Sequence, residues 1–139
     1  MNRWLAPHAD RAYGLMRIVA GFMFTFHGVQ KIFGVLSDHV PAVGSQIWVG
    51  GLIELIGGPM IMLGLFTSCA AFIASGTMAV AYIQFHWRFR LGVDVLPGIN
   101  KGELAALYSV VFLAIACRGA GPFSVDSLQR ARTTSKKAA

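Results

Sequence analysis

The chain has 139 residues, which is enough for one domain, and 55% of them are apolar while only 13% are charged. Together with a mean hydropathy of +0.61, this composition excludes an ordinary small soluble domain and predicts a protein that uses the lipid bilayer as its solvent. The formal charge of +6 does not indicate nucleic acid, because the basic residues lie at the ends of apolar segments and in the tail. The expected partner of these charges is the membrane surface.

Two apolar segments open the chain. The first covers residues 13–36, and at about 1.5 Å per residue it spans a hydrocarbon core of about 30 Å. It carries charged residues and is longer than the apolar core of a signal peptide, so we expect it to be retained. A loop rich in turn residues leads to the second segment, residues 46–66. Both segments predict membrane-spanning helices.

Two further apolar segments follow a tight turn. The third covers residues 69–87 and places Ala71, Ser75 and Ala79 at four-residue spacing. A stripe of small residues lets another helix approach closely, so this face is expected to pack on a neighbour. A long polar connection separates the third segment from the fourth, residues 103–118.

Both chain termini are expected on the cytoplasmic side of the membrane, because basic residues are enriched on that side of membrane proteins. The side that holds the termini collects eight Lys and Arg residues and the other side collects four. The eight are Arg3, Arg11, Arg17, Arg118, Arg130, Arg132, Lys136 and Lys137, and the four are Lys31, Arg88, Arg90 and Lys101. The predicted fold class is therefore all-α, an integral membrane four-helix bundle with both termini cytoplasmic. Residues 1–126 form its single domain, and residues 127–139 are expected to be a basic, disordered cytoplasmic tail.

Five ionisable residues fall in the outer half of this bundle. They are His27 and Lys31 on the first helix, Glu54 on the second, His86 at the end of the third and Glu103 at the start of the fourth. A charged group in hydrocarbon costs about 2.5 kcal/mol or more, so these groups are expected to face the interior and to pair with one another. The sequence therefore predicts a compact polar pocket.

The polar pocket has three interpretations. A pair of Lys31 with Glu54 can be purely structural, with His86 and Glu103 solvated at the interface. A metal site would use His27, Glu54, His86 and Glu103, residue types suited to iron, zinc or manganese, but their spacing does not support it and no metal ligand is predicted. The third interpretation is a quinone site, with Tyr82, Phe85 and Trp87 as an apolar and aromatic wall. It assigns Glu54, His27 and Lys31 as catalytic residues, and the cofactor-binding residues as His27, Lys31, Glu54, Tyr82, His86 and Glu103.

Five short motifs occur in order along nearly the whole chain. They are FHGVQKIFG at residues 26–34, ELIGG at 54–58, LGLFT at 63–67, NKGE at 100–103 and GAGPFSVD at 119–126. Together they resemble the DoxX family of small four-helix membrane proteins. The resemblance implies a multi-pass protein of the bacterial or archaeal inner membrane, related to small membrane subunits of thiosulfate:quinone oxidoreductase and quinol-oxidase assemblies. Other members are linked to thiol and oxidative-stress systems.

Two functions follow from the residues and the resemblance. In the first, the protein is a quinone-linked redox subunit for sulfur or thiol oxidation or for quinol oxidation: Lys31 and His27 donate hydrogen bonds to the quinone carbonyls and Glu54 relays protons. In the second, it is a noncatalytic membrane anchor or assembly factor for a partner complex. One observation supports the second function: Cys69 and Cys117 are far apart in the sequence, so they are predicted to be small core residues and not a redox-active pair. Protein partner subunits or a homo-oligomer are expected in either case.

Overall fold

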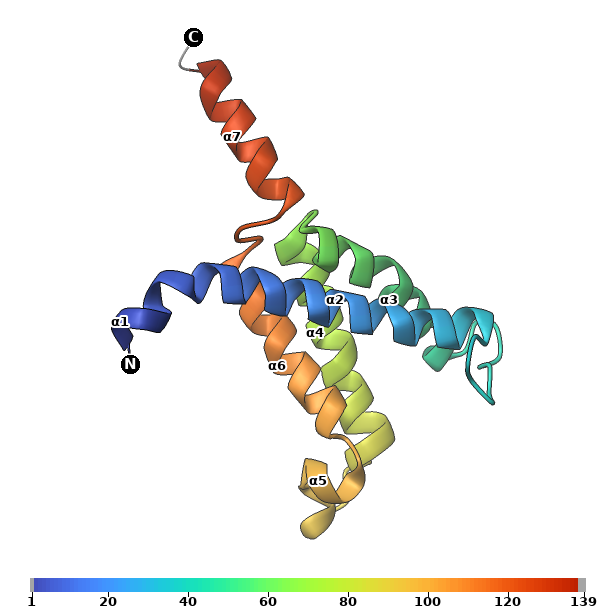
Figure 1. Cartoon of the computed structure of the whole chain (residues 1–139). Helices are drawn as coiled ribbons and strands as arrows, with labels where there is room; N and C mark the ends of the chain where they lie inside the picture. Colours follow the sequence, from blue (N-terminus) through green and yellow to red (C-terminus); the bar gives the residue numbers. More distant parts are fainter. Residues whose placement is uncertain (1, 138–139) are drawn as a thin grey trace.

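The computed structural model describes residues 2–137, and within that range the chain forms helices and loops without any strand (Figure 1). The all-α prediction is confirmed. Short helical turns lie at the start of the chain and between residues 82 and 100. The elements in chain order are α1 (Asn2–Leu5), a 3-10 turn (Ala6–His8), α2 (Ala9–Phe33), α3 (Gln46–Leu63), α4 (Thr67–Ala81), the π-helical segment η2 (Tyr82–Trp87), a 3-10 turn (Val93–Val95), α5 (Pro97–Asn100), α6 (Glu103–Arg118) and α7 (Val125–Lys137).

Glycines in the left-handed conformation end the first two long helices. Helix α2 stops where Gly34 has a φ of 69°, and α3 stops where Gly64 has a φ of 70°. Both helices therefore end before the apolar runs do, because glycine adopts this capping conformation without steric cost. By length and composition, three helical stretches can cross a membrane, Arg3–Phe33, Gln46–Leu63 and Thr67–Trp87, whereas α6 has only 16 residues.

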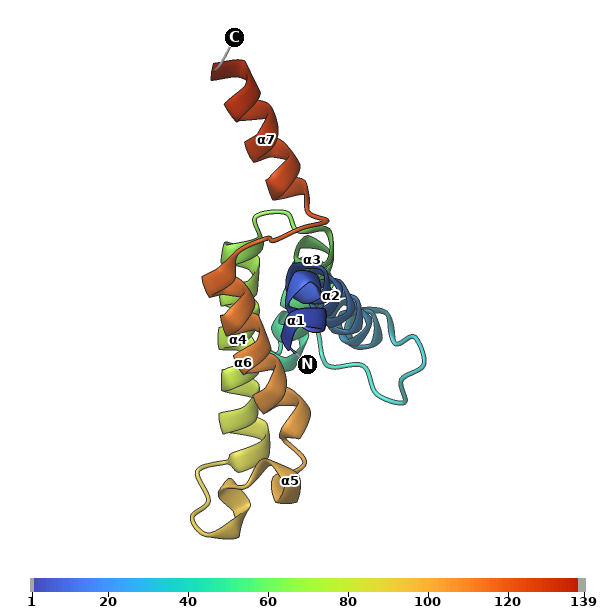
Figure 2. The same cartoon turned by 60° about the vertical axis from the view of Figure 1, so that its left-hand side comes forward.

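The four long helices form two antiparallel pairs that cross each other (Figures 1 and 2). One pair is α2 with α3 and the other is α4 with α6, and each helix has its most extensive contacts within its own pair. This arrangement differs from the compact bundle expected from the sequence. The reason is that small residues hold each pair at close range, while contacts between the pairs are less extensive than those within them.

Close backbone approach explains the first pair. A Cβ atom added to Gly21 would lie 2.6 Å from the backbone N of Met62, and one added to Gly58 would lie 2.6 Å from the backbone N of Thr25. In the second pair, Ala71 and Ser75 of the predicted small-residue stripe are buried. The hydroxyl of Ser75 donates a hydrogen bond to the Ser109 carbonyl of α6, so this face packs on a neighbour as expected.

Aromatic side chains fill the crossing point of the pairs. Phe24 of α2 and Phe112 of α6 are both fully buried, and their ring centroids lie 4.7 Å apart in an edge-to-face arrangement. Tyr108 stacks on Phe112 with a centroid separation of 5.2 Å. Packed aromatic pairs of this kind add to the stabilisation from burial of their area.

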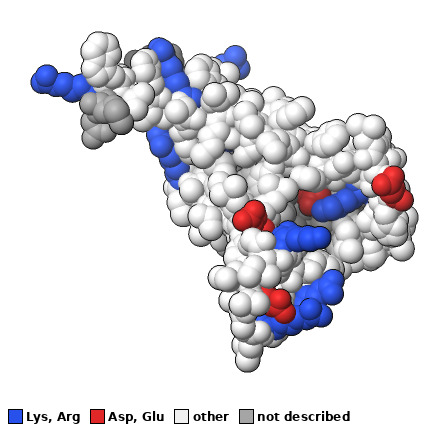
Figure 3. Space-filling view, turned by 60° about the horizontal axis from the view of Figure 1, so that its bottom comes forward, with Lys and Arg blue, Asp and Glu red and all other residues white. Residues whose placement is uncertain are grey.

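Large apolar side chains cover the outside of the helices, including Phe22, Ile56, Phe72, Leu107 and Val110, all more than half exposed. Figure 3 shows broad areas without charge, between which a few groups of Lys, Arg, Asp and Glu side chains are visible. A soluble monomer rarely exposes a continuous apolar surface of this extent, so lipid is the solvent that fits it. Cys69 and Cys117 are also exposed, which corrects the expectation that both are core residues.

The tail differs from the prediction. Residues 127–137 continue helix α7, which begins at Val125 and projects away from the two helix pairs (Figures 1 and 2). The Ser124 hydroxyl accepts a hydrogen bond from the backbone N–H of Ser127, which supplies an N-terminal cap, and the residues that follow include good helix formers. Capping therefore outweighs the polar composition that indicated disorder. Residues 138–139 of the tail lie outside the described range.

Candidate functional site

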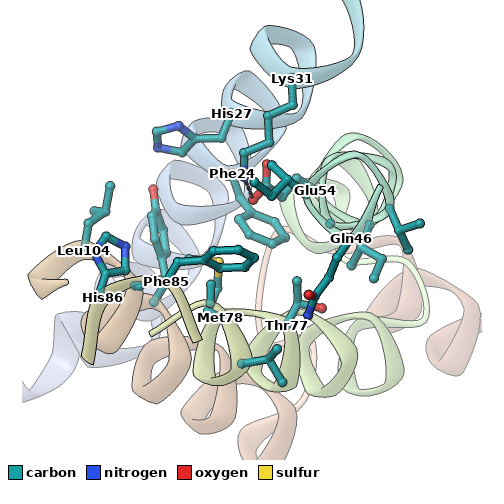
Figure 4. Close-up of a pocket in the computed structure, with 18 of the residues that line it drawn as sticks. Phe24, His27, Lys31, Gln46, Glu54, Thr77, Met78, Phe85, His86 and Leu104 are labelled. Carbon is teal, nitrogen blue, oxygen red and sulfur yellow. Dashed lines mark hydrogen bonds and ion pairs between the residues drawn. The ribbon is translucent and has the colours of Figure 1, made fainter. Parts of the chain in front are cut away.

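A cavity of about 600 Å³ lies between the two helix pairs. It occupies the angle between the C-terminal half of α2 and the N-terminal half of α3 on one side, and the end of α4 and the start of α6 on the other (Figure 4). Much of its lining is apolar or aromatic, including Phe24, Met78, Phe85 and Leu104. Its polar lining residues are His27, Lys31, Gln46, Glu54, Thr77, His86, Lys101 and Tyr108. This combination of an apolar cavity with a few convergent polar groups is typical of small-molecule sites.

An ion pair joins α2 to α3 at the wall of this cavity. The Nζ atom of Lys31 lies 2.5 Å from Oε1 of Glu54, and the Glu54 side chain is 3% exposed while that of Lys31 is 34% exposed. Figure 4 shows the Lys31 side chain reaching across to Glu54. Such a pair in a poorly solvated place is expected to be an ionised carboxylate beside an ammonium.

Two glycines allow this ion pair to form. A Cβ atom at Gly28 would lie 2.4 Å from the backbone N of Leu55, and one at Gly51 would lie 2.8 Å from the Cβ of Lys31. Any other residue at either position would push α2 away from α3. The close approach of the two backbones therefore brings Lys31 within reach of Glu54.

Two buried polar atoms at the cavity lack hydrogen-bond partners within residues 2–137. They are Oε2 of Glu54 and the hydroxyl oxygen of Tyr108, from residues that are 3% and 5% exposed. Both residues line the cavity, Glu54 from α3 and Tyr108 from α6. A buried polar atom that makes no hydrogen bond costs about 1 to 3 kcal/mol, so these atoms call for a partner that enters the cavity.

The two histidines of the predicted pocket both line the cavity and come from different helix pairs (Figure 4). His27 comes from α2, and its ring meets that of Tyr108 edge to face with centroids 6.4 Å apart. His86 comes from the π-helical segment η2, with its Nδ1 atom 3.3 Å from the carbonyl oxygen of Asn100. Such π-helical turns often occur at functional sites, where they redirect side chains.

Tyr82 and Glu103 are not among the residues that line the cavity. The Tyr82 hydroxyl donates a hydrogen bond to the Val95 carbonyl and accepts one from the Asn100 amide, so this side chain holds the loop after η2. The Glu103 carboxylate lies beside Gly98 of α5 and is exposed. Tyr82 and His86 would share a face in an α-helix, but the wider π-helical turn separates them.

The structure thus brings together His27, Lys31, Glu54 and His86 and leaves Tyr82 and Glu103 outside. Phe85, from the predicted aromatic wall, lines the cavity, whereas Trp87 does not. Tyr108, which lines the same cavity from α6, was not predicted from the sequence. Its signal was available: it is the one tyrosine inside the apolar run of residues 103–118, where a hydroxyl group needs a partner.

In the part of the chain that is described, no cluster of metal-binding side chains supports the metal interpretation. Within residues 2–137, no group of three or more His, Cys, Asp and Glu side chains lies close enough together to hold a metal ion. Glu103 points to α5, and His27 and His86 come from different helix pairs.

Comparison with known proteins places the chain. Residues 13–87 match the DoxX family. The chain belongs to the DoxX family. A relative from Haemophilus influenzae, described as an uncharacterized protein, is 40% identical over 116 residues, which cover 81% of this chain and 86% of that protein. No solved structure matches the chain.

This DoxX family member is a multi-pass membrane protein, given its family and its apolar helices. The matched region ends at the C-terminal residue of η2 and contains His27, Lys31, Glu54 and His86. Tyr108 lies beyond it, on α6.

Proposed function

We propose that the cavity binds a quinone-type ligand and that the protein is a membrane subunit of a quinone-linked redox system, acting in sulfur or thiol oxidation or in quinol oxidation. The observation that supports this most is the state of Glu54. One carboxylate oxygen is held by Lys31, and the other has no partner among the described residues, although it is buried at the wall of an apolar cavity. A purely structural ion pair does not require an open cavity beside it.

The cavity fits this class of ligand in size and chemistry. Its volume of about 600 Å³ lies within the range of about 300 to 1,000 Å³ that small-molecule sites occupy. Phe24 and Phe85 supply flat apolar surfaces for a ring. When bound, a quinone or its reduced form carries electrons and protons through the membrane.

The chain's own residues would orient such a ring and handle its protons. Lys31 retains N–H donors beyond the one used by Glu54, and His27 lines the same wall, so both can donate to a ligand oxygen. The Oε2 atom of Glu54 can accept a proton from that oxygen. None of these three residues transfers electrons. A second protein must therefore be the electron donor or acceptor, which is why we propose a subunit rather than a complete enzyme.

The second candidate function is a noncatalytic membrane anchor or assembly factor. One observation favours it: helix α7 projects away from the helix pairs and carries Arg130 and Arg132 beyond the membrane-spanning part (Figure 2). An exposed basic helix can dock a partner without any reaction in the cavity.

Quinone content decides between the two functions. We expect the protein purified from membranes in mild detergent to retain quinone that solvent extraction releases, measured as moles per mole of protein. The double variant Glu54→Gln with Lys31→Met removes both charges of the pair and should lose most of this quinone. The control is Glu103→Gln, the same change at an exposed site outside the cavity, which should retain it. Equal quinone content in all three proteins, or none in any, would leave the anchor function.

We also propose that both termini face the cytoplasm, in a bacterial or archaeal inner membrane. The support is the distribution of Lys and Arg along the chain. A reporter fused after the last residue should be active only when it is of a type that works in the cytoplasm. Activity of a periplasmic reporter at this position would reverse the orientation.

A further inference from the structure

The unpartnered oxygen of Glu54 limits what can bind next to it. Oε1 of this carboxylate already accepts a hydrogen bond from Lys31, and an ionised carboxylate has no hydrogen to donate. A ligand atom that meets Oε2 must therefore be a donor. The carbonyl oxygens of an oxidised quinone are acceptors only, whereas each hydroxyl group of the reduced hydroquinone donates one hydrogen bond.

The other polar groups around the cavity can bind the oxidised and the reduced form of the ligand alike. Lys31 and His27 can donate to a carbonyl oxygen or to a hydroxyl oxygen. The Tyr108 hydroxyl, also without a partner in the described chain, can donate to either oxygen or accept from a hydroxyl group. These residues strengthen binding without distinguishing the two forms. Among the described polar side chains that line the cavity, the Glu54 carboxylate is the one that can accept a hydrogen bond but cannot donate one.

Burial makes that discrimination large. Glu54 is 3% exposed, so water cannot easily replace a ligand donor at Oε2. A carbonyl placed there would leave the carboxylate oxygen unpaired and would bring two acceptors together, and sites with a buried polar group reject ligands that cannot pair with it.

We propose that the cavity selects the reduced, hydroxyl-bearing form of its ligand, a hydroquinone whose hydroxyl group donates to Oε2 of Glu54, over the oxidised quinone. This inference rests on the proposed quinone-type function. It adds that the protein binds the reduced form of the ligand more tightly than the oxidised form. It assigns Glu54 as the residue that sets the preference and Tyr108 as a residue that strengthens binding of both forms.

Three matched ligands test the proposal. They are a decyl-substituted benzohydroquinone, the corresponding benzoquinone, and the dimethyl ether of the hydroquinone, which has the same ring and oxygens but no donor. Binding to the full-length protein in lipid nanodiscs is measured by titration calorimetry without oxygen, with empty nanodiscs as the baseline. Because hydrogen bonds to a charged group are strong, we expect the hydroquinone to bind at least about tenfold more tightly than either of the other two.

Three variants separate the roles. In the double variant Glu54→Gln with Lys31→Met, the introduced amide can donate as well as accept, so the ratio of hydroquinone to quinone affinity should fall to about one. Tyr108→Phe removes a buried hydroxyl without a described partner and should fold as well as the wild type. It should weaken both forms several-fold and leave their ratio unchanged. Glu103→Gln should behave as the wild type does.

The outcomes distinguish this inference from the function beneath it. If the wild type binds hydroquinone and quinone with equal affinity, or binds the dimethyl ether as tightly as the hydroquinone, the preference is wrong while the quinone site stands. If the ratio survives in the double variant, Glu54 does not set it. If none of the three ligands binds to the wild type, the proposed function itself is wrong.

Discussion

Helix α2 carries two cations inside the molecule, and their surroundings differ. Arg17 is fully buried, and its guanidinium donates hydrogen bonds to four backbone carbonyl groups, those of Ile61, Met62, Pro122 and Phe123. These carbonyls belong to the end of α3 and to the segment between α6 and α7. Lys31 is one-third exposed and meets a carboxylate beside a cavity.

In this membrane protein, a structural charged residue and a candidate functional one differ in what surrounds them. The carbonyls at the C-terminal end of a helix carry partial negative charge and need donors, which Arg17 supplies. The Ile61 carbonyl also accepts a hydrogen bond from the backbone N–H of Gly64. The Nε atom of Arg17 also has no partner among the described residues, but Arg17 does not line the cavity. At Glu54, the chain leaves one carboxylate oxygen and the adjacent space for something else.

The largest expected effect is at Arg17. Replacing it in Arg17→Met keeps the apolar stem but removes all four hydrogen bonds that the guanidinium donates, so we expect a loss of about 3 to 5 kcal/mol in the free energy of unfolding. Thermal or denaturant unfolding in detergent measures it. Arg118→Met is the matched control, because Arg118 pairs with Asp10 at the exposed surface, and such a pair contributes about 1 kcal/mol or less. Similar losses for both variants would contradict the structural role of Arg17.

The next effect tests how the Lys31 pair is built. In Gly28→Ala the new Cβ atom would lie 2.4 Å from the backbone of Leu55, and relief of this overlap should cost about 1 to 3 kcal/mol. It should also loosen ligand binding, because Glu54 is the neighbouring residue on α3. Gly57→Ala on α3, the helix that packs on α2, is the control, since a Cβ atom there has open space and alanine favours the helix. Equal unfolding temperatures for the two variants would refute the close approach at Gly28.

A third effect separates stability from binding at the ion pair. Glu54→Gln alone leaves the Lys31 ammonium without its counter-ion, and since Lys31 is 34% exposed it can turn to water, so we expect a loss of about 1 to 2 kcal/mol. Adding Lys31→Met should restore the unfolding temperature. Under the proposed function, the restored double variant still binds hydroquinone poorly. A double variant that is stable and binds normally would make the pair structural, as Arg17 is.

Much of the fold could be predicted from the sequence, because the depth of a residue in a membrane follows from its position along an apolar segment. Counting residues from the helix ends placed His27, Lys31, Glu54 and His86 in the outer half, and the structure brings these four to one cavity. It could not place Tyr82, because no sequence pattern announced the π-helical turn that starts there.

The angle at which the two helix pairs cross could not be predicted from the sequence either. An apolar segment shows that a helix meets lipid, but the angle between helices depends on which small residues face one another. The contacts of Arg17 were hidden for a similar reason. Its partners are backbone carbonyl groups at residues distant in the chain, and any residue type supplies these, so side-chain identities gave no sign of them.

The smallest expected effect concerns Asp126, a charge outside the membrane-spanning segments. Its carboxylate accepts hydrogen bonds from the backbone N–H groups of Phe66 and Thr67 and from the Thr67 hydroxyl, so it caps the start of α4 from the beginning of α7. Removing this cap in Asp126→Ala should cost about 1 kcal/mol in the free energy of unfolding, as loss of other helix caps does. Arg17→Met should cost several times more in the same assay.

Acid should weaken this cap in a defined direction. Burial alone would raise the pKa of Asp126, but the hydrogen bonds from Thr67 and Phe66, helped by the charge of Arg130, hold that pKa below its ordinary value. The stabilisation from the carboxylate is therefore fully present above the pKa of the unfolded chain, about 3.9, and is lost as the pH falls through the lower pKa of the folded protein. Unfolding temperatures measured from pH 7 to pH 3 should thus fall more steeply below pH 4 for the wild type than for Asp126→Asn, whose amide does not titrate. Parallel curves for the two proteins would show that the Asp126 carboxylate does not stabilise the start of α4.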